Sequence, residues 1–195
     1  MALQLDLNKR YTYADYLTWM DEARRELIDG FIKLMTPAPT RKHQNISGNL
    51  FYFLKDYLRK GHCHVFHAPF DVRLSKNGEK EGNKIYTVVQ PDISIICDPA
   101  KLDERGCIGP PDMIVEIVSR HNPERDIKEK FRVYQEHGVA EYWIVFPNDK
   151  AVSVFLLGAD SKYQLVGMYA GDDLIPVNSF NGDLQVHVED IFEES

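Results

Sequence analysis

A strand–helix–strand unit in the second half of the chain places the tightest limit on the fold. The strands DMIVEIV at 112–118 and EYWIVFP at 141–147 are almost wholly apolar. Between them, Asn122 is a candidate N-cap, Pro123 fits the first helical position and Gly138 ends the helix. A unit with such short connections predicts two parallel neighbouring strands in a mixed sheet flanked by helices.

The rest of the chain predicts further elements around this unit. Thr12 and Asp15 resemble a capping box, and Asp29-Gly30 joins two apolar runs that read as a hairpin. No repeat or long linker divides the sequence, so we expect one domain over 1–195 with an N-terminal helix–hairpin extension over about 1–36. The expected elements are helices near 13–20, 41–60 (with Gly61 as C-cap) and 123–137, and strands at 64–74, 90–97, 112–118, 141–147, 151–157, 162–169 and 184–188, with a loop or hairpin tip at 75–87 and a loop at 98–111.

Composition excludes several classes of protein. No apolar run reaches the roughly 20 residues of a membrane helix, and the polar N-terminus is unlike a secretory signal, so we expect a cytoplasmic protein without a membrane partner. Cys63, Cys97 and Cys107 form no CxxC pair, and their odd number argues against a disulfide framework. The net charge of −7 counts against a protein that scans duplex DNA, but less against a nuclease, for which a few local cations suffice.

Two carboxylates interrupt strands that otherwise read as buried. Glu116 lies within the run 113–118, and Asp92 opens the apolar run 93–96 directly after Pro91. A buried carboxylate is costly unless a cation or hydrogen-bond donors meet it. Side by side on neighbouring strands, the two could hold a hard cation such as Mg²⁺. The alternatives are an edge-strand glutamate that faces solvent and an ordinary strand-start aspartate.

A lysine follows on the helix after the Glu116 strand. Asp126, Lys130 and Tyr134 are spaced at i, i+4 and i+8, so they share one helix face beside the apolar positions Ile127 and Phe131. A helix that packs this face on the sheet delivers the ammonium toward the two carboxylates. The alternative is an ordinary Asp–Lys surface pair, which stabilises a helix by about 0.3–0.5 kcal/mol.

A histidine and cysteine cluster is a rival metal site. His62, Cys63, His64 and His67 offer four zinc ligands within six residues. Ligands from so short a segment do not easily close a tetrahedral site, and no second ligand pair with zinc-like spacing exists elsewhere in the sequence. A zinc-binding structural protein is therefore the weakest of the hypotheses.

The order of these elements, with a strand-start aspartate, a mid-strand glutamate and a lysine, resembles the PD-(D/E)XK nuclease superfamily. Over nearly its whole length the chain is similar to the Uma family of restriction-endonuclease-like proteins. Two positions depart from the pattern: Val118 stands where the superfamily has its lysine, and Arg120 replaces the usual proline after Ser119. The motifs that carry the resemblance are 26–30 (ELIDG), His43, Pro91-Asp92, Pro111-Asp112, 116–119 (EIVS), Asp126-xxx-Lys130-xxx-Tyr134 and 138–143 (GVAEYW).

The resemblance implies an α/β (α+β) fold with a restriction-endonuclease-like core, and a metal-dependent endonuclease that hydrolyses the phosphodiester bonds of nucleic acid, with DNA as the expected substrate. Asp92 and Glu116, with the carbonyl of Ile117, would bind Mg²⁺ or Mn²⁺, and Lys130 would supply the missing ammonium from the helix. Glu26 is a candidate for a second metal or a supporting contact, although a plain hairpin role is an open alternative. The other supporting candidates are His43, which could donate to a phosphate at the start of helix 41–60, Asp126 and Tyr134.

Two further expectations concern assembly and the competing function. A homodimer would serve the cutting of both strands of a duplex, with the Val/Phe-rich strand 151–157 as an apolar patch unless it belongs to the core. The alternative function is a catalytically inactive nuclease-fold protein that acts in binding or regulation. The acidic net charge favours that alternative, and the clustered charges of Asp92, Glu116 and Lys130 favour the nuclease.

Overall fold

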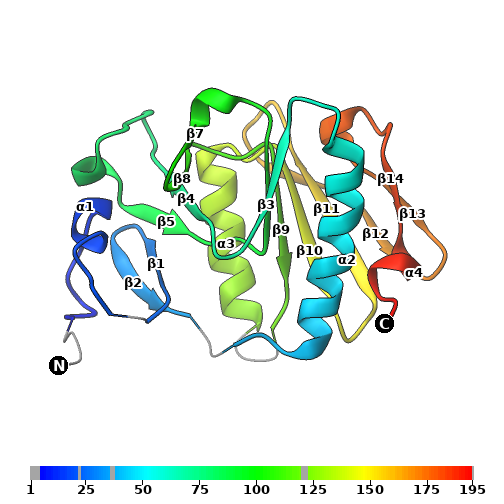
Figure 1. The fold of residues 1–195 in the computed structure, drawn as a ribbon, viewed down its shortest axis with the longest axis horizontal. Coiled ribbons are helices and arrows are strands. Elements are labelled where there is room, and N and C mark those ends of the chain that lie inside the picture. The colour runs from blue at the N-terminus through cyan, green and yellow to red at the C-terminus, as the bar shows by residue number, and fades with distance from the viewer. Residues whose placement is uncertain (1–4, 22, 36–37, 120–122, 195) are drawn as a thin grey trace.

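Two six-stranded sheets lie side by side in the computed structural model of this chain (Figure 1). The structure describes residues 5–21, 23–35, 38–119 and 123–194, and for 123–126 the backbone alone. The central sheet contains, in spatial order, β12 (Tyr163–Ala170), β11 (Ala151–Leu157), β10 (Glu141–Phe146), β9 (Met113–Ile117), β6 (Ile93–Ile96) and β3 (His64–His67). The second sheet contains β2 (Phe31–Leu34), β1 (Arg25–Ile28), β5 (Thr87–Val89), β4 (Asp71–Leu74), β8 (Gly106–Ile108) and β7 (Leu102–Asp103).

The strand–helix–strand unit folds as the sequence predicts. Strands β9 and β10 pair in parallel, and α3 (Pro123–His137) connects them. Strand β6 pairs with β9 in the antiparallel direction, which confirms the expected neighbourhood of the strands that carry Asp92 and Glu116. The other pairings in the central sheet are antiparallel, so the sheet is mixed.

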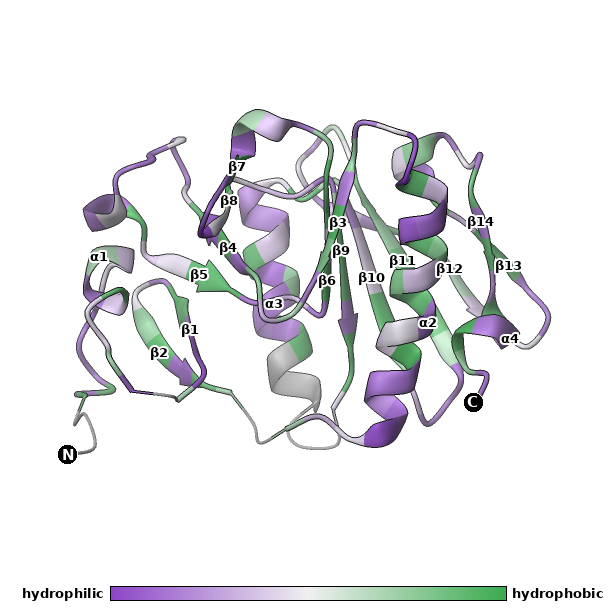
Figure 2. Cartoon of the chain, viewed as in Figure 1, coloured by the Kyte–Doolittle hydropathy of each residue, from purple (hydrophilic) through white to green (hydrophobic). Residues whose placement is uncertain are grey.

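Helices cover the two faces of the central sheet. Alternate side chains of β9 point to opposite faces: Met113, Val115 and Ile117 join the core under α2 (Arg41–Leu58), whereas Ile114 joins the core under α3. The second core also takes side chains from β4 and β5, so it binds the two sheets together. Figure 2 shows hydrophobic and hydrophilic residues alternating in bands along α2.

The apolar stripe of α2 differs from the predicted one near its end. Ile46, Leu50, Leu54 and Leu58 are buried at steps of four, whereas Tyr57 is exposed. The helix ends at Leu58 and its C-cap is Arg59 in a right-handed conformation, so the assignment of the C-cap to Gly61 is wrong. The apolar contact of Leu58 with the core fixes the last turn without a left-handed residue.

The predicted single strand at 64–74 is wrong, because two strands in different sheets occupy this segment. Strand β3 lies at the edge of the central sheet and β4 in the second sheet. Between them, Pro69 has no backbone N–H to continue a ladder, and the chain changes sheets there. The sequence also gave no sign of β5, or of β7 and β8 inside the predicted loop 98–111, because these strands have only two or three residues.

Smaller elements complete the chain. Helix α1 (Tyr13–Tyr16) is shorter than predicted, but its Thr12–Asp15 capping box is present. The predicted hairpin is formed by β1 and β2, with Asp29 and Gly30 at positive φ in the turn. At the C-terminus β13 (Leu174–Pro176) pairs with β14 (Gln185–His187), and α4 (Val188–Ile191) follows; the 3₁₀ helices span Gly82–Lys84, Pro99–Lys101 and Asn178–Phe180.

Cys63 and Cys97 form a disulfide, and Cys107 is a buried free thiol. The inference against a disulfide framework from the odd cysteine count is therefore wrong, because one pair forms and the third cysteine is simply left over. Within the described residues, no helix is both long and apolar enough to cross a membrane.

Candidate active site

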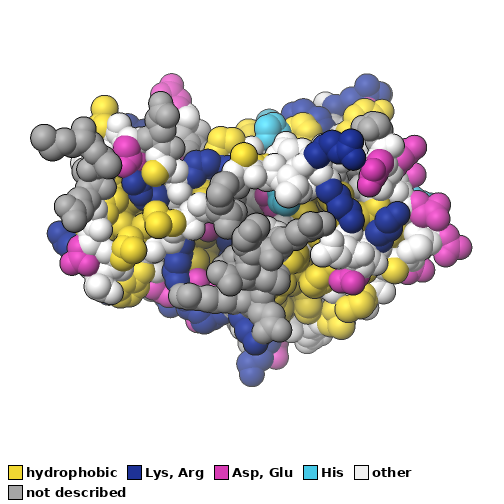
Figure 3. Space-filling model, turned by 90° about the horizontal axis from the view of Figure 1, so that it is seen from below, with side chains coloured by type: hydrophobic (Ala, Val, Ile, Leu, Met, Phe, Trp, Pro, Cys, Tyr) yellow, Lys and Arg dark blue, Asp and Glu magenta, His cyan; other side chains and the backbone are white. Residues whose placement is uncertain are grey.

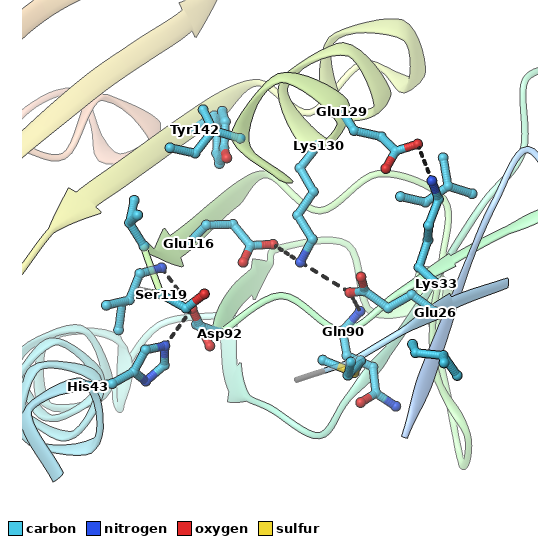
Figure 4. A pocket seen from close by; sticks show the side chains of 16 residues that line it. Glu26, Lys33, His43, Gln90, Asp92, Glu116, Ser119, Glu129, Lys130 and Tyr142 are labelled. Carbon is cyan, nitrogen blue, oxygen red and sulfur yellow. Dashed lines mark hydrogen bonds and ion pairs between the residues drawn. The ribbon is translucent and has the colours of Figure 1, made fainter. Parts of the chain in front are cut away.

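The carboxylates of Asp92 and Glu116 lie on the same face of the central sheet. The antiparallel register of β6 and β9 pairs Ile93 with Val115, so continuing it by one residue places Asp92 opposite Glu116. Both residues alternate with side chains that enter the α2 core, and they therefore face the α3 side (Figure 4). Carboxylates on opposite faces of the sheet could not share one metal ion, whereas these two lie on the same face and can.

Lys130 reaches these carboxylates from α3. Its Nζ lies 2.8 Å from Oε1 of Glu116 and 3.1 Å from Oε1 of Glu26, which β1 of the second sheet supplies. The side chains of Glu26, Glu116 and Lys130 are only 7%, 13% and 15% exposed. Lys130 is thus a largely buried bridge between the two sheets, so neither a surface position for this lysine nor a plain hairpin role for Glu26 fits the structure.

Glu116 has an unusual electrostatic environment for a carboxyl group. Burial raises its pKa to about 7; the Lys130 ammonium acts against this shift, and the carboxylates of Asp92 and Glu26 add to it. The Tyr134 hydroxyl donates a 2.5 Å hydrogen bond to Oε1 of Glu116. Burial, reinforced by the Glu116 charge, raises the pKa of Tyr134 well above its ordinary value, so this hydroxyl keeps its proton and acts as a donor.

Lys130 remains charged in this environment. Burial alone would lower its pKa, but the carboxylates of Glu116 and Glu26 outweigh burial and hold the pKa well above its ordinary value. The site therefore contains a permanent ammonium beside a carboxyl group that titrates near neutrality. Such strongly shifted groups in one pocket are typical of catalytic sites, although structural ion pairs can produce them too.

Asp92 is oriented by the strand next to it and by α2. Its Oδ2 accepts a 2.7 Å hydrogen bond from the backbone N–H of Ile117, and Nε2 of His43 lies 3.3 Å from the same oxygen. Burial would lower the pKa of His43, but its hydrogen bond to Asp92 and the charge of Asp92 raise it overall. The predicted position of His43 at the start of α2 is right, and its ring faces Asp92.

These side chains line a pocket of about 180 Å³ at the junction of the two sheets and both long helices. Lys33 and Glu129 form a 2.8 Å ion pair among its lining residues. Figure 3 views the molecule from the end at which α2 begins and shows lysine and arginine side chains scattered among acidic and hydrophobic ones. Figure 4 labels ten of the pocket residues: Glu26, Lys33, His43, Gln90, Asp92, Glu116, Ser119, Glu129, Lys130 and Tyr142.

The donor set suits a hard divalent cation. Three carboxylates, of Glu26, Asp92 and Glu116, line the pocket with the ammonium of Lys130, which contacts the first and the last of them; the second lysine, Lys33, is paired with Glu129. When all are ionised they carry an excess of two negative charges, which one divalent ion would neutralise. Within the described residues, Oε2 of Glu116 and Oδ1 of Asp92 accept no hydrogen bond, so each carboxylate keeps an oxygen for a metal.

One contributor was missed from the sequence, and one expected contributor cannot be placed. Gln90 donates its backbone N–H to Oε1 of Glu26 at 2.8 Å and its side-chain amide to Asp71 at 2.9 Å, so it fixes the Glu26 carboxylate. Its position two residues before Asp92 was the only available signal. The side chain of Asp126 lies outside the described residues, as does the expected N-cap Asn122.

Comparisons with known proteins agree with this architecture. Residues 13–189 match the profile of the Uma2 family, described as "Putative restriction endonuclease". The uncharacterised protein slr1290 of Synechocystis sp. is 24% identical over 163 residues, which cover 82% of this chain and 81% of that protein. A crystal structure from Anabaena variabilis, titled as a putative nuclease belonging to DUF820, has a TM-score of 0.73 at 21% identity and covers 93% of this chain and 97% of that one. This last likeness shows a shared fold.

Proposed function

This chain belongs to the Uma2 family of restriction-endonuclease-like proteins, and from that premise we propose that its pocket hydrolyses phosphodiester bonds of nucleic acid, with DNA as the substrate and Mg²⁺ or Mn²⁺ as the cofactor. The observation that carries the proposal is the cluster of Asp92, Glu116 and Lys130 on one face of the central sheet, because two carboxylates and an ammonium that are largely shielded from solvent have little structural use there. Family membership supports nuclease chemistry; the metal and the substrate are our inference.

Asp92 and Glu116 are the residues we propose as metal ligands, with the carbonyl of Ile117 beside them. When bound, the ion would polarise the phosphate and lower the pKa of a water molecule. The protein's own contribution is to hold the two carboxylates in place: the Ile117 N–H fixes Asp92, and the Tyr134 hydroxyl fixes Glu116. Glu26 lies on the other side of Lys130 and is the candidate for a supporting contact or a second metal ligand.

Lys130 would stabilise the negative charge that develops on the phosphate or orient the attacking water. Its permanent charge, and its tether to both Glu26 and Glu116, keep Nζ inside the pocket before substrate arrives. This arrangement supports the view that the helix lysine replaces the superfamily lysine, whose usual position is occupied by Val118. His43 would donate to a substrate phosphate or maintain the orientation of Asp92.

The second candidate function is a catalytically inactive nuclease-fold protein that acts in binding or regulation. The net charge of −7 favours it, since phosphate contacts dominate affinity for nucleic acid. The fully assembled charge cluster favours the enzyme. A homodimer and a single domain over 1–195 also remain proposals; strand β11, the earlier candidate for a dimer patch, lies between β10 and β12 with Ala151 to Val154 buried.

A cleavage assay separates the two functions. Purified protein is incubated with supercoiled plasmid, linear duplex DNA, single-stranded DNA and RNA, with Mg²⁺, Mn²⁺ or a chelator. We expect metal-dependent cleavage of DNA that is lost in Glu116→Gln and kept in Glu104→Gln, which changes an exposed turn residue. Binding without cleavage under all metal conditions would refute the proposed activity, and equal activity of the two variants would refute the site.

A further inference from the structure

A second group of metal-ligating side chains lies at the end of the central sheet opposite the acidic pocket. Cys63 directly precedes β3 and Cys97 directly follows β6. The antiparallel register pairs His64 with Ile96, so the two cysteines are cross-strand neighbours one residue further on. In Figure 1 this end lies where α2 finishes and β3 begins, whereas His43 lies at the start of α2.

His62 adds a third donor to the cysteine pair. One ring nitrogen of His62 and the Sγ atoms of Cys63 and Cys97 all lie within 4.8 Å of one another. Thiolates and imidazole are the ligands that Zn²⁺ prefers, with bonds of about 2.3 Å and 2.0–2.1 Å. Tetrahedral bonds of these lengths separate ligand atoms by roughly 3.3–3.8 Å. Small side-chain rotations would therefore bring the three donors around one ion once the sulfurs are no longer bonded to each other.

The surroundings hold two of the three donors firmly. Cys63 belongs to the buried core under α2, and Cys97 packs against that core. The backbone N–H of Cys97 donates a 2.7 Å hydrogen bond to Oδ2 of Asp112, which fixes the end of β6. His62 is exposed, so an ion could enter from solvent and keep a water molecule as its fourth ligand.

We propose that His62, Cys63 and Cys97 form a site for Zn²⁺ or a similar thiophilic divalent ion in the reduced protein, and that oxidation replaces this site by the Cys63–Cys97 disulfide. On metal binding, each thiol releases a proton and each sulfur donates an electron pair to the ion. On oxidation by a small disulfide, two protein thiols become one disulfide, and the small disulfide takes up two electrons and two protons to give two thiols. Metal and disulfide are mutually exclusive because both use the same sulfur atoms.

This site differs from the zinc cluster that the sequence offered. His64 and His67 were the other candidates; His64 lies on the exposed edge strand, and the ring of His67 packs on Phe51 with its Nδ1 2.9 Å from the carbonyl of Ala68. The missing ligand is Cys97, which lies 34 residues from Cys63 in the sequence. Pairing of β3 with β6 supplies this one distant ligand, which the spacing of residues in the sequence does not reveal.

The test uses full-length reduced protein under anaerobic conditions, with Mg²⁺ in excess to occupy hard-ligand sites. Co²⁺ is titrated as the probe, because thiolate ligation gives a charge-transfer absorption, and Zn²⁺ is then added to displace it. The variants are Cys97→Ser and His62→Gln, with Cys107→Ser as the matched control for a buried thiol outside the site. In parallel, alkylation of each cysteine is followed by mass spectrometry in the wild-type protein, so that one measurement does not depend on a variant that folds.

We expect one Co²⁺ per chain with thiolate charge transfer, displacement by Zn²⁺, and protection of Cys63 and Cys97 from alkylation. Loss of a contact that only supports a ligand typically costs about 10–100-fold in metal affinity. Cys97→Ser removes a ligand itself, so Co²⁺ affinity should fall by more than about 100-fold, and His62→Gln should lower it by at least about 10-fold. Cys107→Ser should bind Co²⁺ with the affinity of the wild type. Oxidised glutathione should remove two thiols per chain together with Co²⁺ binding. The proposal would be overturned if Co²⁺ gave no thiolate absorption, if Zn²⁺ did not protect Cys63 and Cys97 from alkylation, or if oxidation left Co²⁺ binding unchanged.

Discussion

Replacing Lys130 by methionine tests whether this residue only stabilises the fold as part of an ion pair or also supplies a charge for catalysis. Methionine keeps most of the apolar stem and removes the ammonium. The variant loses the contacts of Nζ with Glu116 at 2.8 Å and Glu26 at 3.1 Å, and it leaves two buried carboxyl groups without their cation. We expect the metal-free variant to be less stable and the metal-bound variant to recover much of the loss, because a divalent ion supplies the missing charge.

The size of the effect follows from these distances. Two unit charges about 3 Å apart attract by roughly 5.5 kcal/mol at an effective dielectric constant of about 20. Desolvation offsets much of this attraction, and removing one partner of a buried ion pair typically costs about 3–5 kcal/mol. We expect a loss of about 3 kcal/mol, at the lower end of that range, because the lysine lines a pocket that water can enter. A tenfold gain in Mn²⁺ affinity would return about 1.4 kcal/mol at saturation.

Chemical denaturation without Mn²⁺ measures the loss in free energy of unfolding, and denaturation with Mn²⁺ measures how much of it the metal restores. Lys128→Met, on the exposed face of the same helix, is the control. Mn²⁺ should stabilise Lys130→Met by more than it stabilises the wild type, whereas Lys128→Met should match the wild type. In the cleavage assay Lys130→Met should lose at least about 10-fold in rate, as expected for removing one electrostatic stabiliser. If the two variants respond alike to Mn²⁺ and cleave alike, Lys130 is part of a structural ion pair and the catalytic assignment fails.

Three further predictions concern pH, the tyrosine and a buried carboxylate outside the pocket. Because the pKa of Glu116 is about 7 and a metal ligand must be deprotonated, Mn²⁺ affinity measured by calorimetry should fall by up to about 10-fold per pH unit below 7 and level off above it; a flat profile from pH 5.5 to 8 would contradict this. Tyr134→Phe removes a donor to the charged carboxylate, so the same profile should shift to higher pH, and an unshifted profile would refute its role. Glu141→Gln should lower the free energy of unfolding by about 3 kcal/mol without changing Mn²⁺ affinity, because Glu141 accepts hydrogen bonds from Trp143 and Ser179 away from the pocket; a loss of affinity would contradict this separation.

The sequence predicted the parts of the fold that depend on long periodic segments. The helix at 123–137 matches α3, and the strand that contains Glu116 pairs with both predicted neighbours. Capping residues and apolar periodicity act locally, so they are visible without coordinates. Strands β5, β7 and β8 were not predicted, because two or three residues carry no period and are held by pairing to distant strands.

The site was predictable in its residue types and unpredictable in its contacts. A glutamate within an apolar strand indicated a buried charge, and helix spacing indicated that Lys130 faces the sheet. That Glu26 would share this lysine depends on how the second sheet docks, and Gln90 acts on Glu26 through its backbone N–H, which no side-chain pattern reveals. The Cys63–Cys97 pair was missed for the same reason, since only the β3–β6 register brings the two residues together.

The central claim is that Asp92 and Glu116 hold a divalent metal ion. Anomalous X-ray scattering from crystals grown with Mn²⁺ tests it most directly, because it locates the ion independently of catalysis. The account predicts an anomalous peak within coordination distance of one oxygen of Asp92 and one of Glu116, with the peak absent in crystals of Glu116→Gln grown in the same way. A pocket without a peak at saturating Mn²⁺, with Lys130 still bridging Glu26 and Glu116, would contradict it.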